Sequence, residues 1–229
     1  MENLPEQRYE LKMVAQGTQL PLVRSWIRSH PSGLVTSYPS RRVNNIYLDS
    51  PDLQAFDDSL AGVSDRRKVR FRWYGDEISA VEGVVEVKRK KNSTSWKVAC
   101  ALNARFDFSQ GMKWADFVAT LSAELPVRML AEMESAWWPV LINRYRRDYY
   151  VTSDGEVRVT VDYAQELYDQ RRTVYPDLSR KVPYPDTVVV EVKAAAGSWD
   201  RIKDLCNNFP IAITKNSKYA NGCVALLNN

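Results

Sequence analysis

Histidine and cysteine are scarce in this chain of 229 residues. The only histidine, His30, stands before Pro31 at the end of an expected helix, where we expect a surface residue that supports neither a histidine-based metal site nor a catalytic triad. The three cysteines, Cys100, Cys206 and Cys223, form no Cys-x-x-Cys pair. This argues against a disulfide framework or a thiolate zinc site and favours a reducing compartment.

Long apolar runs, low-complexity tracts, long linkers and internal repeats are also missing. No run approaches the roughly 18 apolar residues of a membrane-spanning helix. The first residues do not resemble a signal peptide. We therefore expect a cytoplasmic protein, one domain over residues 1–229, with any membrane association supplied by a partner protein.

Charge of one sign is not in large excess. Lysine and arginine total 32 against 28 aspartate and glutamate, and 45% of the residues are hydrophobic. This is the composition of an ordinary globular protein, and its net charge of +4 does not indicate nucleic acid by itself. The positions of the charges therefore carry more information than their number.

Strand-like and helix-like segments alternate along the chain, which predicts the α+β class. Strands are expected at residues 8–14, 43–49, 66–74, 82–91, 94–101, 139–151, 156–163 and 187–194, with a weaker candidate at 165–175. Helices are expected at 18–29, from Ser50 to Leu60 before Gly62, at 113–136 with a break near Pro126, and at 198–208 and 217–227.

Charged and apolar residues alternate with period two in five of these strands, so each strand has one charged face and one apolar face. The charged or polar faces are Arg8, Glu10 and Lys12; Lys68, Arg70 and Arg72; Glu86, Lys88 and Lys90; Arg158, Thr160 and Asp162; and Glu191 and Lys193. A solvated face explains any one strand. The whole set, with Glu-x-Lys present three times, favours a β-barrel with charges inside and helices packed outside.

Charges enclosed in a barrel need a partner, because unpaired buried ions cost several kcal/mol each. A chain of phosphates with a divalent cation supplies one, since Lys and Arg bind phosphate oxygens and carboxylates bind Mg²⁺ or Mn²⁺. In residues 143–149, Arg147 shares a face with Tyr145 and Tyr149, while Arg144 lies on the other face. The sequence does not say which face points inward.

A second candidate anion site lies at the start of the last helix. Lys215 and Lys218 are three residues apart and can face one way, and Ser217 lies between them beside free backbone N–H groups. Simple surface solubility is the alternative for both lysines.

Eight segments along the chain resemble, in the family's order, the VTC domain (vacuolar transporter chaperone type). That domain is a polyphosphate polymerase, belongs to the triphosphate tunnel metalloenzymes and is related to CYTH proteins. They are RYELK at 8–12, NNIYLDSPDLQAF at 44–56, RRKVRFRWYG at 66–75, VEVKRK at 85–90, RYRRDYY at 144–150, VRVTVD at 157–162, VVEVK at 189–193 and KNSKY at 215–219. The resemblance implies an eight-stranded antiparallel β-barrel that forms a triphosphate tunnel. It also implies transfer of the ATP γ-phosphate onto a growing polyphosphate chain with Mn²⁺ or Mg²⁺.

The resemblance also implies roles for individual residues. The catalytic cations would be Lys12, Arg70, Arg72, Lys88, Arg147 and Lys193, and phosphate would further bind to Arg158, Lys215, Lys218, Tyr145, Ser217 and Lys68, with Lys97 as an extra contact. The metal ligands would be Glu191 first, then Glu86 and Glu10. CYTH hydrolases carry Glu-x-Glu-x-Lys on the first strand, where this chain has Arg8 in place of the first glutamate. One fewer carboxylate favours the polymerase.

Three alternatives to a polymerase stay open. The first is an inorganic or nucleoside triphosphatase. The second is a non-catalytic binder of polyphosphate, nucleotide or a protein tail. The third, an RNA-binding module that stacks bases on Trp73, Tyr145 and Tyr149, is weaker. The tunnel hypothesis itself predicts one cavity shared by Glu10, Lys12, Arg70, Arg72, Glu86, Lys88, Arg158, Glu191 and Lys193.

Overall fold

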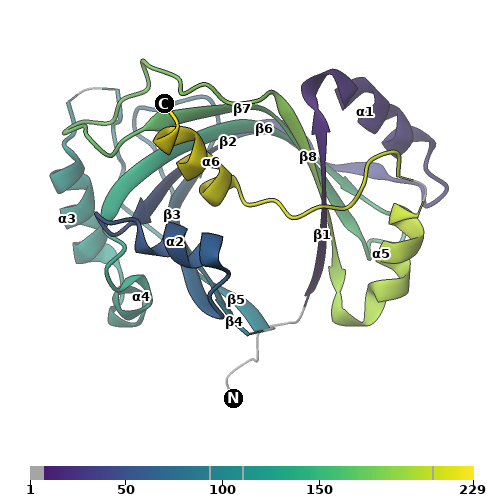
Figure 1. The fold of residues 1–229 in the computed structure, drawn as a ribbon, viewed down its shortest axis with the longest axis horizontal. Helices are drawn as coiled ribbons and strands as arrows, with labels where there is room; N and C mark the ends of the chain where they lie inside the picture. Colours follow the sequence, from purple (N-terminus) through teal and green to yellow (C-terminus); the bar gives the residue numbers. More distant parts are fainter. Residues whose placement is uncertain (1–7, 93, 110, 208) are drawn as a thin grey trace. The chain divides into compact units, whose positions relative to one another are not determined.

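The computed structural model describes residues 8–92, 94–109, 111–207 and 209–229 (Figure 1). The first residues, on which the expectation of no signal peptide rests, lie outside these ranges. The strands are β1 (Arg8–Gln16), β2 (Val35–Asp49), β3 (Asp65–Tyr74), β4 (Val84–Lys91), β5 (Thr94–Ala101), β6 (Trp138–Val151), β7 (Arg158–Asp169) and β8 (Thr187–Ala195). The helices are α1 (Leu20–Ser29), α2 (Gln54–Ala61), α3 (Trp114–Glu124), α4 (Val127–Met133), α5 (Trp199–Cys206) and α6 (Lys218–Leu227), with 3-10 turns η1 (Gly17–Gln19) and η2 (Ala196–Ser198).

The eight strands form one sheet in the order β1-β8-β7-β6-β2-β3-β4-β5. The pairs β1–β8, β7–β8, β2–β3, β3–β4 and β4–β5 are antiparallel. The α+β class and the eight-stranded antiparallel sheet are therefore confirmed. The weak candidate at 165–175 is the end of β7, which runs to Asp169.

Two element starts differ from the sequence-based prediction by more than two residues. β2 begins at Val35 instead of residue 43. The prediction missed this part because its first six residues are all exposed, so no alternation between a buried and an exposed face marks it as a strand. α2 begins at Gln54 instead of Ser50, because Leu53 before it is in the left-handed conformation, with φ of 62°. The Oγ of Ser50 accepts from the N–H of Gln54 (3.0 Å), and Asp49 accepts from the amides of Ala55 (2.9 Å) and Phe56 (3.0 Å). Gly62 ends α2 with φ of 71°, as the prediction required.

The chain divides into two compact units, and the prediction of a single domain stays a prediction. The first unit holds the described residues up to Arg42 with Tyr145–Gln165 and Pro185–Ser217. The second holds Val43–Arg144, Glu166–Tyr184 and Lys218–Asn229.

In the first unit, α1 and α5 cover the apolar face of β1, β7 and β8, and Figure 1 shows both helices on one side of β1 and β8. The buried residues of this core include Met13, Val23, Ile27, Val159, Val161, Val190, Val192, Ile202 and Leu205. Because side chains alternate along a strand, burying Val190 and Val192 turns Glu191 to the opposite face. The apolar core thus sets the direction of the charged side chains.

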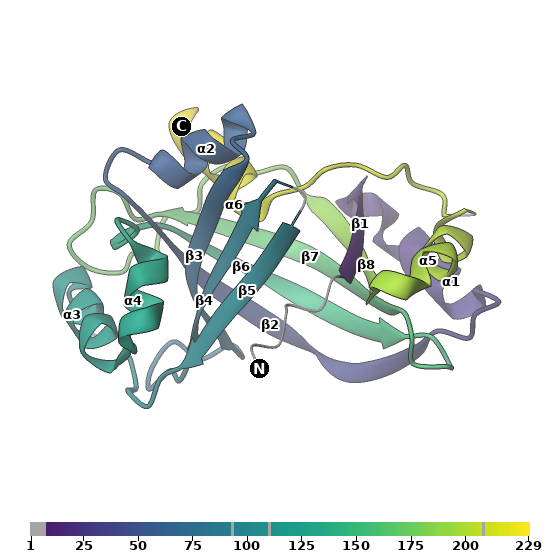
Figure 2. The ribbon, with the colours of Figure 1, turned by 90° about the horizontal axis from the view of Figure 1, so that it is seen from below.

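In the second unit, two cores lie on the two faces of the sheet. On one face α3 and α4 pack against β3 and β4 through an aromatic cluster that includes Phe71, Trp73, Phe106, Phe108, Trp114 and Phe117. On the other face α2 and α6 pack around Tyr47, and Figure 2 shows these two helices together above β3. The ring of Tyr219 in α6 stacks on that of Tyr47, with centroids 5.1 Å apart. Helices therefore contact both faces of this unit.

Candidate functional site

A first charged cluster forms in the first unit, on the face of β1, β8 and β7 that is opposite the apolar core. Lys12 pairs across strands with Glu191, which pairs in turn with Thr160. In the next row, Glu10 pairs with Lys193, which pairs with Arg158. With Arg147 and Asp162, which contact these rows, the first cluster is Glu10, Lys12, Arg147, Arg158, Thr160, Asp162, Glu191 and Lys193.

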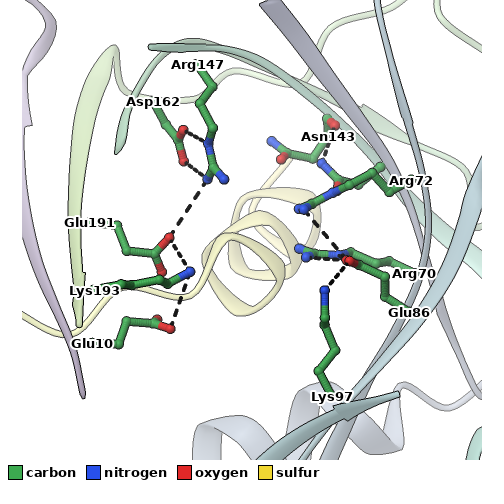
Figure 3. A network of polar contacts seen from close by, with 11 residues as sticks. Glu10, Arg70, Arg72, Glu86, Lys97, Asn143, Arg147, Asp162, Glu191 and Lys193 are labelled. Carbon is green, nitrogen blue, oxygen red and sulfur yellow. Dashed lines mark hydrogen bonds and ion pairs between the residues drawn. The ribbon is translucent and has the colours of Figure 1, made fainter. Parts of the chain in front are cut away.

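Two carboxylates of the first cluster share two ammonium groups, and Figure 3 shows one of them, that of Lys193, between Glu191 and Glu10. The Nζ of Lys12 lies 2.7 Å from Glu10 Oε1 and 3.6 Å from Glu191 Oε1. The Nζ of Lys193 lies 3.0 Å from Glu191 Oε2 and 3.7 Å from Glu10 Oε2. Either lysine could turn to an incoming anion while the other still compensates the carboxylates.

Electrostatics in the first cluster favour the charged forms of Glu191 and Lys12. Burial acts to raise the pKa of Glu191, but the surrounding cations, led by Lys193, hold that pKa well below its usual range. Burial acts to lower the pKa of Lys12, but Glu191 and Glu10 raise it above its ordinary value. Both groups are therefore charged at neutral pH.

Arg147 joins the first cluster, which answers the question that the sequence left open. Its Nε and Nη2 lie 2.5 Å and 2.7 Å from the two carboxylate oxygens of fully buried Asp162, and its Nη2 lies 4.0 Å from Glu191. Burial acts against the charge of Arg147, but Asp162 raises its pKa well above the ordinary value. The guanidinium carbon lies 5.4 Å from the centroid of Tyr145, which is itself buried. Arg144 is bound elsewhere, with its Nε donating to Asn44 Oδ1 (2.8 Å).

A second charged cluster forms in the second unit on the face of β3, β4 and β5 that is opposite the aromatic core. Three lysines face one another across these strands, since Lys68 pairs with Lys88 and Lys88 pairs with Lys97. The neighbouring row pairs Tyr47 with Arg70 and Arg70 with Glu86, and the row beyond pairs Asn45 with Arg72. The second cluster is Asn45, Lys68, Arg70, Arg72, Glu86, Lys88 and Lys97.

Glu86 is the one carboxylate among the five cations of the second cluster, and it binds three of them (Figure 3). Its Oε2 lies 2.6 Å from Arg70 Nη2 and 3.7 Å from Arg72 Nη1, and its Oε1 accepts from Lys97 at 2.7 Å. Burial acts to raise the pKa of Glu86, but Arg70 and Arg72 lower it from 4.5 to about 2. Glu86 therefore serves as an internal counter-ion of this cationic face.

The predicted residues at the start of α6 lie next to the clusters of their own units. In the first unit, Thr214 N–H donates to the Lys12 carbonyl (2.8 Å) and Lys12 Nζ donates to the Asn216 carbonyl (3.1 Å), so Lys215 and Ser217 follow the edge of β1 beside Lys12. In the second unit, Lys218 precedes Tyr219, whose ring stacks on Tyr47, the cross-strand partner of Arg70.

The structure also brings in residues that the sequence did not single out. Asn45 Oδ1 accepts from the Nε of Arg72 (2.9 Å), and Asn45 Nδ2 donates to the main-chain oxygen of Asn143 (3.2 Å). Both asparagines are completely buried. Asparagine is depleted in strand interiors, so its presence within two predicted strands is a signal that could have identified both residues.

Two of the three predicted metal ligands lie in one cluster, and the role of all three stays a prediction. Within the described ranges, no three His, Cys, Asp or Glu side chains gather as a metal site. Glu10 and Glu191 lie together in the first cluster, whereas Glu86 belongs to the second. The predicted cavity shared by nine side chains concerns both units and stays a prediction. Among the described residues no helix has the length and apolarity to cross a membrane.

Two solved structures resemble this chain in fold. A proposed adenylate cyclase from Vibrio parahaemolyticus is 11% identical, with a TM-score of 0.53 over 95% of this chain and 98% of its own. A proposed adenylyl cyclase from Hippeastrum, described as having a dominant triphosphatase activity, is 13% identical, with a TM-score of 0.56 over 94% and 96%. No curated protein matches the sequence.

A family model describes almost the whole chain. The VTC domain model matches residues 7–227, which include every residue of both charged clusters. The segments that carry the resemblance supply these same side chains, such as Glu10 and Lys12 from RYELK and Glu191 and Lys193 from VVEVK. The chain belongs to the VTC domain family.

Proposed function

We propose that this protein is a polyphosphate polymerase that transfers the γ-phosphate of ATP onto a growing chain of inorganic phosphate. The observation that carries this proposal is the second cluster, in which five cations face a single carboxylate. Like charges directly opposite each other repel across a sheet, and Lys68, Lys88 and Lys97 stand in one such row. A linear polyanion along that row would offset the repulsion.

The first cluster supports the reaction itself. Its oxygen donors fit a divalent cation. Glu10 and Glu191 contact the same two lysines, so their carboxylates lie close together. The buried Oγ1 of Thr160, opposite Glu191, has no hydrogen-bond partner among the described residues. Mg²⁺ prefers oxygen ligands and is commonly held by one or two carboxylates together with substrate phosphates. A bound Mn²⁺ or Mg²⁺ would neutralise charge on the transferring phosphoryl group.

The cations of the first cluster would position the donor phosphates. Lys12, Lys193 and Arg147 each contact Glu191 in the free protein and would bind phosphate oxygens in the complex. Arg158, in the row of Glu10 and Lys193, is exposed and adds a fourth cation. Phosphoryl transfer needs positioning and charge stabilisation more than a protein nucleophile, which agrees with a chemistry built from lysine, arginine and glutamate.

A triphosphatase is the second candidate. It is favoured by the similarity in fold to the Hippeastrum protein, which is described as a triphosphatase. The two reactions need the same donor site and differ in the acceptor, which is water for a hydrolase and a terminal phosphate for a polymerase. The long cationic face of the second cluster favours a phosphate chain as the acceptor.

Incubation with ATP and Mn²⁺, followed by ³¹P NMR, tests the proposal. A polymerase gives the resonances of internal phosphates of a chain. Orthophosphate without internal phosphates would support the triphosphatase instead, and unchanged ATP together with polyphosphate binding would identify a binder. Arg147→Ala serves as the inactive control, since Arg147 bridges Asp162 and Glu191 within the first cluster.

A further inference from the structure

Asn143 in β6 carries a buried side-chain amide without a hydrogen-bond partner among the described residues. The residue is completely buried, and within the described part of the chain neither its Nδ2 nor its Oδ1 has a hydrogen-bond partner. Leaving one buried polar atom unsatisfied costs about 1–3 kcal/mol. An amide left so in a folded protein is therefore either a cost without benefit or a group that an ordered water or a ligand satisfies.

The position of Asn143 points to the second alternative. Its main-chain oxygen accepts from Asn45 Nδ2 (3.2 Å), and Asn45 Oδ1 accepts from Arg72 Nε (2.9 Å), so one chain of contacts connects it to the second cluster (Figure 3). It shares a strand face with Leu141, against which α6 packs so closely that a Cβ at Gly222 would meet Leu141 Cδ2 at 2.4 Å. Ile142, between them, points into the aromatic core on the other face.

We propose that Asn143 is a phosphate-binding residue of the second cluster. Its Nδ2 donates to an oxygen of a phosphate chain held by Arg70 and Arg72, and its Oδ1 accepts from a water that hydrates that chain. Because Asn143 is covered in the free protein, binding has to displace the side chains above it, and satisfying the amide offsets part of that cost. This inference rests on the proposed binding of polyphosphate.

Replacement by leucine tests the idea through two effects of opposite sign. Asn143→Leu removes the unsatisfied amide, so we expect the Tm to rise by about 2–4 °C. The same variant loses a ligand contact, so we expect the Kd for tripolyphosphate, measured by titration calorimetry, to rise about tenfold. A purely structural amide would give the reverse pattern, a lower Tm with unchanged affinity.

Asn44 offers a matched control one strand away. It is also completely buried, but its Nδ2 donates to the Gly75 carbonyl (2.9 Å) and its Oδ1 accepts from Arg144 (2.8 Å). Asn44→Leu should therefore lower the Tm, because both partners lose their hydrogen bonds. If Asn143→Leu does not fold, the Kd can be measured on Asn143→Ala, because the smaller side chain of alanine needs less space.

The outcomes separate this inference from the proposed function. If the wild type binds tripolyphosphate and Asn143→Leu and Asn143→Ala bind it equally well, Asn143 is not a ligand contact and the polymerase proposal stands. If the wild type itself does not bind tripolyphosphate, both proposals are wrong, because no phosphate chain remains for the amide to contact.

Discussion

At the scale of single residues, Glu86 and Glu191 are both buried carboxylates among cations, but their surroundings give them different roles. Glu86 faces three cations with no second carboxylate nearby in its cluster, whereas Glu191 has Glu10 beside it. A pair of adjacent carboxylates can hold a divalent cation, and a lone one surrounded by arginines is already neutralised. The two residues should therefore respond differently to loss of charge.

Glu86 should make stability depend on acidic pH. Its pKa is lowered from 4.5 to about 2 in the folded protein, so it contributes stability above pH 4.5 that disappears as the pH falls towards 2. The contribution is on the order of 3 kcal/mol. Urea unfolding at pH 6 and pH 2.5 should show wild type losing more stability than Glu86→Gln. Equal losses in both proteins would contradict the role of Glu86 as counter-ion.

Glu191→Gln should separate metal chemistry from phosphate binding. The substitution keeps the shape but removes the charge that a divalent cation needs, so Mn²⁺-dependent turnover of ATP should fall at least a hundredfold. It also leaves Lys12, Lys193 and Arg147 without one anion, so tripolyphosphate should raise its Tm more than that of the wild type. Turnover close to wild type would exclude the metal role.

At the scale of secondary-structure elements, the sequence predicts the bounds of those strands in which charged and apolar residues alternate. The strands β3 and β4 follow the predicted ranges closely, because one face is buried in the aromatic core and the other carries charge at every second residue. The exposed first part of β2 has no such contrast and was missed. The start of α2 was misplaced because Ser50 is a good capping residue and does accept the amide of Gln54, and only the structure shows that the helix begins at Gln54 itself. Asn143 was missed because the sequence cannot show that a buried amide lacks a hydrogen-bond partner among the described residues.

The hydroxyl of Tyr219 adds a polar anchor to the packing that holds helix α6. Tyr219 donates to Asp49, which also caps α2, so this carboxylate connects two helices to the end of β2. Tyr219→Phe leaves the ring stacked on Tyr47 but removes the hydrogen bond to a charged group, which is worth about 1.5–3 kcal/mol. We expect that loss in chemical denaturation, with a rise in Kd for tripolyphosphate because Lys218 is less fixed. Val224→Ala, at an exposed position of α6, is the control, and an equal change in Kd would contradict the positioning role.

At the scale of the whole molecule, a net charge of +4 understates the local charge, because acidic residues elsewhere compensate the cationic face. Binding of a polyanion should therefore weaken steeply with ionic strength. We expect the Kd for tripolyphosphate to rise more than tenfold between 50 mM and 500 mM NaCl, and less steeply in Lys97→Ala. Arg105→Ala, which removes an exposed cation paired with Glu82 outside both clusters, should keep the wild-type slope. A Kd independent of salt would contradict a polyanion ligand.

The row of Lys68, Lys88 and Lys97 also has a consequence for how the chain folds. Strands β3, β4 and β5 follow one another in sequence and pair as neighbours, so this meander forms through local contacts. Its closing brings three ammonium groups into register before any substrate is bound, a conflict between the local electrostatics and the native pairing. Phosphate-rich anions in the surrounding solution would relieve this conflict while the meander forms. The ligand of the mature site would then also accelerate the chain's own refolding.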